Sequence, residues 1–221
     1  VISMKFRILK PFCLNNLLQG CMVISLILSF TTLASQSSKR EILLSEIEEI
    51  RNSSNFNSKD TLYIHNLIAL AYEYRFHNLD SLYTLSQKNL ALSKKAEYTN
   101  GEISSYHSMG GYYSDKGKID QAIIYFNKAY KLAEKYENNF LKVRTLNDLA
   151  KEYGYKGDYS KSLKWYLEAM EIAEKHNYKN SISIINDNIA HLYLEQKDFQ
   201  QATARRSTSL SFFFTKIKSH T

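Results

Sequence analysis

Histidines and carboxylates are the side chains of this 221-residue sequence that could hold a metal or transfer protons. The six histidines, at positions 65, 77, 107, 176, 191 and 220, show no metal-ligand spacing within one helix. No Gly-x-Ser-x-Gly motif occurs, and no acidic pair repeats as a general acid and base would require. The sequence therefore predicts no bound metal, no cofactor, no small-molecule substrate and no enzymatic activity.

Aromatic side chains could also bind ligands, because their faces stack on bases or sugars. A group of them between residues 112 and 165 permits two interpretations, a stacking platform and packing between helices. Packing is favoured, since helices use aromatic rings to fill the space between neighbours. These residues are Tyr112, Tyr125, Tyr130, Tyr155, Tyr159 and Trp165.

The formal net charge of +7 raises the question of a nucleic-acid partner. Residues 35–202 contain 22 Lys or Arg and 22 Asp or Glu, so this part of the chain is neutral. A mixed, solvated surface is expected there, without a basic face, and no nucleic-acid partner is predicted. The surplus cations are Lys5, Arg7, Lys10, Arg205, Arg206, Lys216 and Lys218.

A pattern of residue types recurs at a constant interval of about 40 residues and indicates which elements position these side chains. Each copy has a large apolar residue, a small residue directly after it and a tyrosine three positions further on. A turn glycine, a second small residue, an aromatic residue and an alanine complete the two central copies. The signature residues are Leu70, Ala71 and Tyr74; Met109, Gly110, Tyr113, Gly117, Ala122, Phe126 and Ala129; Leu149, Ala150, Tyr153, Gly157, Ser162, Tyr166 and Ala169; and Ile189, Ala190, Tyr193 and Ala202.

The spacing within one copy predicts two antiparallel helices joined by a turn. Residues i, i+1 and i+4 share one helical face, as Met109, Gly110 and Tyr113 do. The small residue lets a second helix approach closely, and Gly117 can take the positive φ that the turn needs. One proline and seven glycines in the whole chain favour long helices over strands.

The order of large-small, tyrosine, alanine, aromatic and alanine positions resembles the tetratricopeptide repeat. The usual period of that family is about 34 residues, so the longer period of this chain is similar to its variant with longer helices. The resemblance implies an all-α fold, a right-handed α-α superhelix (solenoid) of about three and a half helix-turn-helix repeats over residues 60–202. An antiparallel bundle without solenoid order is the alternative. The first copy is the loosest, because Asn78 replaces the turn glycine and the turn is one residue shorter.

The resemblance also implies a concave groove, lined by the first helices of successive repeats, that holds an extended peptide or a partner helix. The expected function is therefore a non-enzymatic scaffold that binds a protein or peptide. We expect Asp148 to orient Arg144 through an intrahelical ion pair, because the two are four residues apart. The carboxylate clamp of co-chaperone members is not reproduced. The expected groove residues are Arg75, His107, Arg144, Asn147, Asp148, Lys151, Asp187, Asn188 and His191.

A second functional hypothesis is an extracytoplasmic sensory module. Long-period repeats behind a signal segment resemble the input half of bacterial sensor kinases and transcription regulators, of which this chain would be a truncated form. A downstream output domain would distinguish this hypothesis from the scaffold.

Residues 1–34 have the features of a signal peptide. Three cations in the first ten residues precede an apolar stretch at 22–30, and small residues lead to a cleavage site after Ala34. The protein is therefore expected to be exported, periplasmic or secreted. An uncleaved membrane anchor is the chief alternative, and lipid attachment at Cys21 is another. Cys13 and Cys21 both precede the cleavage site, so the mature protein would form no disulfide.

Residues 35–59 are expected to form a leading helix, over about 38–52, followed by a polar linker. This helix should pack on the first repeat, whose first helix Asp60 can cap. Residues 203–221 depart from the repeat pattern, so they are a divergent last helix or a truncated end.

We predict that expression with the native start in a Gram-negative host yields a protein that begins at Ser35, or within two residues of it, outside the cytoplasm. The reason is that signal peptidase cleaves after small residues such as Ala34. N-terminal sequencing of fractionated cells measures this. An intact start on soluble cytoplasmic protein would contradict export, and an intact start on membrane-bound protein would indicate the anchor.

Overall fold

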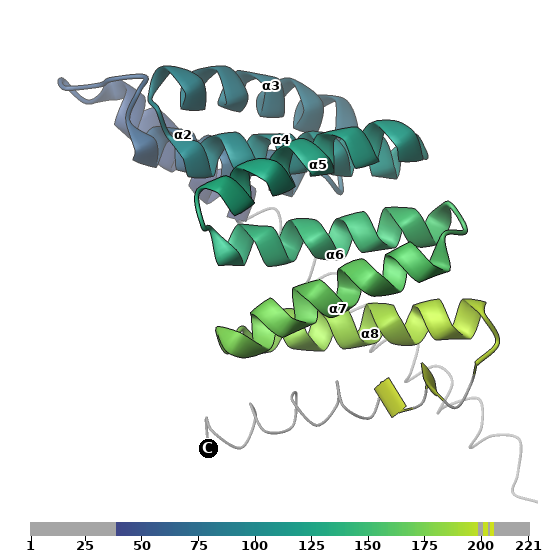
Figure 1. The fold of residues 1–221 in the computed structure, drawn as a ribbon. Helices are drawn as coiled ribbons and strands as arrows, with labels where there is room; N and C mark the ends of the chain where they lie inside the picture. The colour runs from purple at the N-terminus through teal and green to yellow at the C-terminus, as the bar shows by residue number, and fades with distance from the viewer. Residues whose placement is uncertain (1–38, 199–200, 203, 206–221) are drawn as a thin grey trace, which may run out of the picture.

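The structure, a computed structural model, describes residues 39–198, 201–202 and 204–205, and all regular elements in these residues are helices. Residues 39–52 form the leading helix, and further helices follow it (Figure 1). None of the described helices is long and apolar enough to cross a membrane. The predicted signal segment, both cysteines and most of the predicted tail lie outside the described residues. The further helices are α2 (Thr61–Tyr74), α3 (Leu79–Lys95), α4 (Thr99–Asp115), α5 (Ile119–Lys135), α6 (Asn139–Tyr155), α7 (Tyr159–Lys175) and α8 (Lys179–Glu195).

Helices α4 to α8 recur at regular intervals, with starts at positions 99, 119, 139, 159 and 179. Each has 17 residues and is followed by a short turn that contains a residue of positive φ. After α4, the Gly117 N–H donates to the Ser114 carbonyl at 2.9 Å, and the Lys118 N–H donates to the Tyr113 carbonyl at 2.8 Å. This Schellman arrangement satisfies carbonyls that the helix end would leave unpaired. The predicted role of the turn glycine is confirmed, and the same conformation occurs at Glu97, Glu137, Gly157, Asn177 and Lys197.

The turn between α2 and α3 differs from the others. It spans residues 75–78, and no left-handed residue occurs in it. Asn78 has a φ of −155°, and its side chain accepts a hydrogen bond from the Ser81 N–H at 3.0 Å, which caps α3. Asn78 therefore does not substitute for the turn glycine as predicted, because its short amide is better used at a helix N-cap. The turn is also not shorter than the later ones, although we expected it to be: it spans residues 75–78, whereas the turn after α4 spans residues 116–118. The residue that this repeat lacks is lost from the end of α2.

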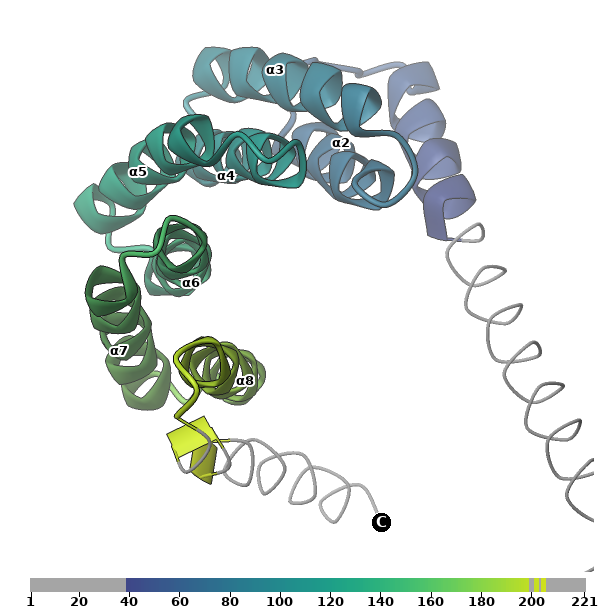
Figure 2. The ribbon, with the colours of Figure 1, turned by 90° about the vertical axis from the view of Figure 1, so that its right-hand side faces the viewer.

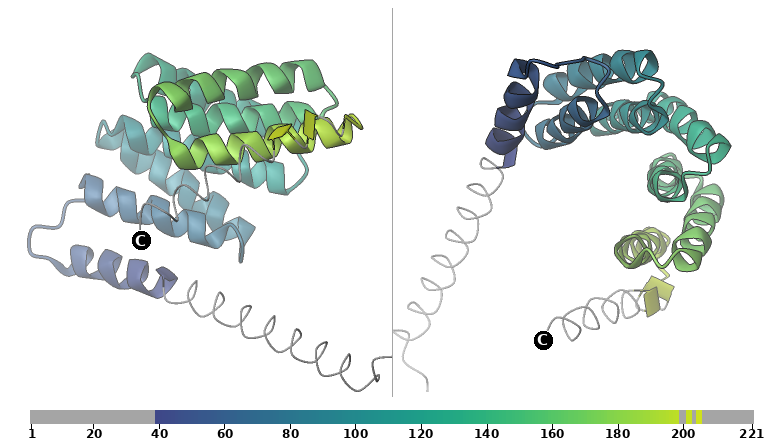
Figure 3. Two further views of the ribbon diagram at one scale, coloured as in Figure 1. Left: turned by 90° about the horizontal axis from the view of Figure 1, so that it is seen from below. Right: turned by 90° about the vertical axis from the view of Figure 1, so that its left-hand side faces the viewer.

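The helices form a curved, two-layer solenoid (Figure 2). Helices α2, α4, α6 and α8 lie on the inner side of the curve, and α3, α5 and α7 lie on the outer side, as the views in Figure 3 also show. Each inner helix contacts the next inner helix as well as its neighbours in the chain. The predicted all-α solenoid is confirmed, and the alternative of a bundle without solenoid order is wrong.

The signature residues fill the space between the two layers. Gly110 of α4 packs directly on the ring of Phe126 of α5, because a Cβ at Gly110 would lie only 2.5 Å from the Phe126 Cδ1. The predicted close approach of the two helices is therefore confirmed. The other buried signature residues are Leu70, Ala71, Met109, Ala122, Ala129, Leu149, Ala150, Ser162, Tyr166, Ala169, Ile189, Ala190 and Ala202.

The leading helix packs on the first repeat, as expected. Leu43 and Ile47 are buried against apolar side chains of α2. The carboxylate of Asp60 accepts a hydrogen bond from the Leu62 N–H at 2.8 Å and so caps α2. The solenoid thus begins, within the described residues, with a helix that covers one face of α2.

The additional aromatic residues mainly pack against one another. Tyr113 and Tyr125 stack with ring centroids 5.2 Å apart, and Tyr130 meets Trp165 edge to face at 5.7 Å. The packing interpretation therefore holds for these rings. Tyr155 and Tyr159 are different, because 57% and 37% of them are exposed.

We predict that Gly110→Leu lowers the free energy of unfolding by at least about 3 kcal/mol, the upper part of the range for overpacked cores. The new side chain must displace the buried Phe126 ring. Urea unfolding followed by circular dichroism measures the change. Gln121→Leu, at an exposed position of α5, is the control and should shift stability by about 0.5 kcal/mol or less. Equal stability of the two variants would contradict the assigned helix contact.

Candidate functional site

Polar side chains of the four inner helices form one connected row, which we call the polar spine. The Tyr72 hydroxyl of α2 lies 3.2 Å from the His107 Nδ1 of α4. The His107 Nε2 lies 2.8 Å from the Asp148 Oδ2 of α6. The Asn147 amide donates to the Asp148 Oδ1 at 3.3 Å, and the Asn188 amide of α8 donates to the Asn147 Oδ1 at 2.8 Å. The polar spine therefore links all four repeats across the concave side.

Burial decides how the polar spine is protonated. His107 is only 4% exposed, and desolvation lowers the pKa of its imidazole although Asp148 opposes the shift. Burial would raise the pKa of Asp148, but the contact with His107 and the charges of Lys151 and Arg75 lower it to about 2. At neutral pH we therefore assign a neutral His107, with its Nε2 proton toward the Asp148 carboxylate and its Nδ1 accepting from Tyr72.

An apolar pocket of about 330 Å³ opens beside the polar spine, between side chains of the four inner helices. Val143 and Ile185 are buried in its wall. Phe76 and Ile184 also line it, yet they are 77% and 54% exposed. Ligand sites commonly combine such apolar walls with a few fixed polar groups. The apolar pocket is therefore the part of the concave side best suited to take an apolar group.

Two arginines line the apolar pocket, and they differ in whether a carboxylate binds them. Arg75 donates two hydrogen bonds to the carboxylate of Asp115, at 2.6 and 2.8 Å. The Arg144 guanidinium lies 5.1 Å from the centroid of the Tyr72 ring, and it has no carboxylate partner among the described residues. The expected ion pair between Arg144 and Asp148 is wrong, because Asp148 faces His107 of the neighbouring repeat and the Tyr72 ring attracts the guanidinium.

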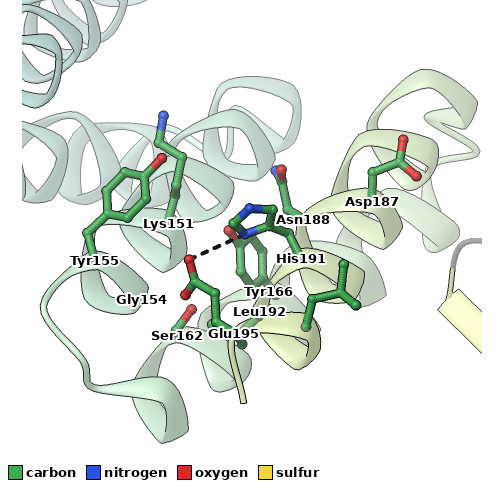
Figure 4. Close-up of a pocket in the computed structure, with 11 residues that line it drawn as sticks. Lys151, Gly154, Tyr155, Ser162, Tyr166, Asp187, Asn188, His191, Leu192 and Glu195 are labelled. Carbon is green, nitrogen blue, oxygen red and sulfur yellow. Dashed lines mark ion pairs between the residues drawn. The ribbon is translucent and has the colours of Figure 1, made fainter. Parts of the chain in front are cut away.

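A second cavity, which we call the polar pocket, measures about 660 Å³ and lies between α6, α7 and α8 (Figure 4). Lys151 lines it from α6, and Asp187 and His191 line it from α8. The His191 Nδ1 lies 3.5 Å from the Glu195 Oε1 on the same helix. Asn188 lines it too, so the end of the polar spine borders this pocket.

All nine predicted groove residues line the apolar pocket or the polar pocket. Partner binding by these residues stays a prediction. His107 lines the apolar pocket but is nearly buried, so it adds little open surface to the groove. The sequence analysis did not identify Tyr72, Phe76 and Ile184 as pocket residues. Spacing could have found two of them, because Tyr72 precedes Arg75 by one helical turn and Ile184 precedes Asn188 by one turn. No group of His, Cys, Asp or Glu in the described part of the chain is arranged to hold a metal.

The fold and the groove define the class of protein. A curved stack of helix pairs, with the side chains of the inner helices on its concave side, is an α-solenoid. Such repeat proteins present extended concave surfaces to other proteins. The family described as Tetratricopeptide repeat matches residues 101–175, which hold the two central copies. This match over residues 101–175 supports the resemblance to the tetratricopeptide repeat that the sequence predicted. A comparison with curated proteins found no match.

Several solved structures have a similar fold. BtubC from P. vanneervenii has a TM-score of 0.65 at 14% identity, over 80% of this chain and 73% of its own. A Rap protein complexed with competence and sporulation factor has a TM-score of 0.65 at 14% identity, over 79% of this chain and 50% of its own. A STAND protein with a tetratricopeptide repeat sensor, from Pyrococcus horikoshii, has a TM-score of 0.63 at 17% identity, over 84% and 30%. This chain thus spans half or less of the last two proteins, and the likeness concerns the fold alone.

We predict that Asp148→Asn reduces the acid sensitivity of folding. A depressed pKa stabilises the fold above the unfolded value of 3.8, and the contribution is lost as the pH falls toward 2. The pH-dependent part of the difference between the parent and the variant should be about 2 kcal/mol. Urea unfolding from pH 6 down to about 2 measures it, with Asp120→Asn, whose side chain is 75% exposed, as the control. A difference that stays constant with pH would contradict the assignment.

Proposed function

We propose that this chain is an interaction scaffold whose concave side binds an extended peptide segment of a partner. The observation that carries the proposal is Arg144, a cation without a carboxylate partner among the described residues, beside an open apolar pocket. The exposed Phe76 and Ile184 at this pocket would lose contact with water when an apolar side chain of the ligand entered it. Arg144 would then meet a carboxylate of the same ligand.

The asparagines of the polar spine support a peptide over other ligands. A side-chain amide can both donate to and accept from a peptide backbone. Asn147 and Asn188 are held by each other and by Asp148, so their amides are already oriented. Pre-orientation lowers the entropy that binding costs.

The spacing along α6 limits what the ligand can look like. Arg144 lines the apolar pocket itself, and Asn147 follows it by about one helical turn, about 5 Å along the axis. An extended peptide covers this distance with about two residues. We therefore expect a ligand with a large apolar residue at the apolar pocket and a carboxylate within a few residues of it.

Two further observations agree with this function. The Rap protein of similar fold is known in a complex with competence and sporulation factor, so one solenoid of this shape does hold a partner. The signal-peptide features of residues 1–34 favour a scaffold that acts after export. The same location would suit the input module of a sensor, which is the second candidate function.

Selection from a displayed library of random twelve-residue peptides tests the proposal. We expect the parent protein to enrich peptides that contain a large apolar residue near an acidic one. Ile184→Arg should abolish their binding, because the new side chain fills the apolar pocket with a charge. Arg144→Ala should weaken binding about tenfold, the effect of one lost charge-assisted hydrogen bond. Binding constants for individual synthetic peptides measure both effects.

The matched control is Leu167→Arg, on the outer helix α7. Leu167 is 45% exposed, close to the exposure of Ile184, but it lies in the other layer of the solenoid. This variant should bind like the parent. Enrichment of no peptide family, or equal binding by Ile184→Arg and the parent, would contradict the concave side as the binding surface.

A further inference from the structure

Gly154 forms the floor of the polar pocket, at a point where α6 packs closely against α7 and α8. It lies within α6, where glycine is less favourable than alanine. A Cβ at Gly154 would lie 3.3 Å from both the Leu192 Cδ1 and the Ser162 Oγ. A larger side chain there would project against α7 and α8. The corresponding position holds Ser114 in the preceding repeat, so the repeat itself does not require a glycine here.

Ser162 supplies a second, independent observation. It is fully buried, it lines the polar pocket, and its hydroxyl has no hydrogen-bond partner among the described residues. A buried polar group without a hydrogen-bond partner destabilises the fold, so such groups are uncommon outside sites where a ligand supplies the partner. Figure 4 shows Ser162 and Tyr166 between the side chains of α6 and those of α8. A polar ligand in the pocket can supply the hydrogen-bond partner that the Ser162 hydroxyl lacks.

Charges of opposite sign line the polar pocket from different helices. Lys151 of α6 lies 6.0 Å from the Tyr155 ring centroid and forms no ion pair within the described part of the chain. On α8 stand the carboxylates of Asp187 and Glu195, and the ion-pair contact of Glu195 is with His191 of its own helix. Burial, together with nearby carboxylates that include Glu195, raises the pKa of the Tyr166 hydroxyl. The pocket therefore has a cationic wall and an anionic wall that do not pair directly.

We propose that the polar pocket is a binding site for a small zwitterion of the amino-acid class, separate from the peptide site. The carboxylate of the ligand pairs with Lys151, and its ammonium group pairs with Glu195. The Ser162 hydroxyl and the floor at Gly154 border the rest of the molecule. The volume of about 660 Å³ accommodates a free amino acid or a short peptide with both termini free, which share this chemistry.

Thermal unfolding of the whole chain with individual ligands tests this site. The probes are the twenty L-amino acids at 10 mM, and the dipeptides Gly-Gly, Ala-Ala and Leu-Leu. At a concentration about a hundred times Kd, the melting temperature of the parent should rise by about 5 °C or more. A rise with amino acids and not with dipeptides identifies the free amino acid as the source, and the reverse result identifies the short peptide. No rise above about 1 °C with any probe would overturn the proposal.

Chemical and protein variants then test the assigned contacts. The N-acetyl and the amide derivatives of the active probe lack the ammonium and the carboxylate group respectively, and both should lose the effect. Lys151→Met and Gly154→Val should lose it too, the first by removing the cation and the second by filling the floor. Lys131→Met, an exposed lysine of α5, is the control and should respond like the parent. A rise that persists in Lys151→Met, or with both blocked derivatives, would overturn the assignment.

These results are independent of the peptide experiment. Ile184→Arg changes the apolar pocket and should leave the response to the zwitterion intact. Lys151→Met removes the zwitterion site, while Arg144 and the apolar pocket remain. Failure at one site is therefore distinguishable from failure at the other.

Discussion

The short turn with a left-handed residue is the constraint on which the rest of the structure depends. It separates helices of equal length, so α4 to α8 begin at positions 99, 119, 139, 159 and 179. Glycine takes this conformation easily, whereas for an L-residue such as Glu137 it costs about 1 kcal/mol or more. The backbone bonds that close the turn and the packing of the two helices offset that cost. The helix pair is therefore the unit that repeats, and every second helix occupies an equivalent place.

This fixed repeat brings the polar spine together. Residues at the same place in successive inner helices become neighbours, and the steps from His107 to Asn147 and from Asn147 to Asn188 are close to the period. Buried polar groups are costly unless they bond to one another. One or two polar positions per repeat satisfy this condition, because His107 meets Asp148 and Asn147 meets Asn188 in neighbouring repeats. The concave side gains oriented amides without interrupting the apolar core between the layers.

The sequence alone predicted the features that depend on local spacing or on the repeat, namely the helix contact, the turn and the residues that line the inner helices. Gly110 and Gly117 have the roles that their positions indicated, and the predicted groove residues line the two pockets of the inner helices. The partner of Asp148 was not predictable, because local spacing favours the i,i+4 neighbour Arg144 whereas His107 arrives from another repeat. The polar pocket was missed for the same reason: its floor at Gly154 exists only where three helices meet.

The outer helices of the repeats differ in how many polar side chains they bury. The outer helix of the first repeat has Ser86, Asn89 and Ser93 buried, where α5 has an aromatic ring and two alanines. The Asn89 Oδ1 and the Ser93 Oγ have no hydrogen-bond partner among the described residues, a cost that the apolar residues at the same places of α5 avoid. Stability in a solenoid is nearly a sum over neighbouring repeats, and local opening therefore begins at the weakest one. The apolar pocket is lined by residues of the inner helices from α2 to α8, so an occupant would contact the first and the last of the described inner helices at once.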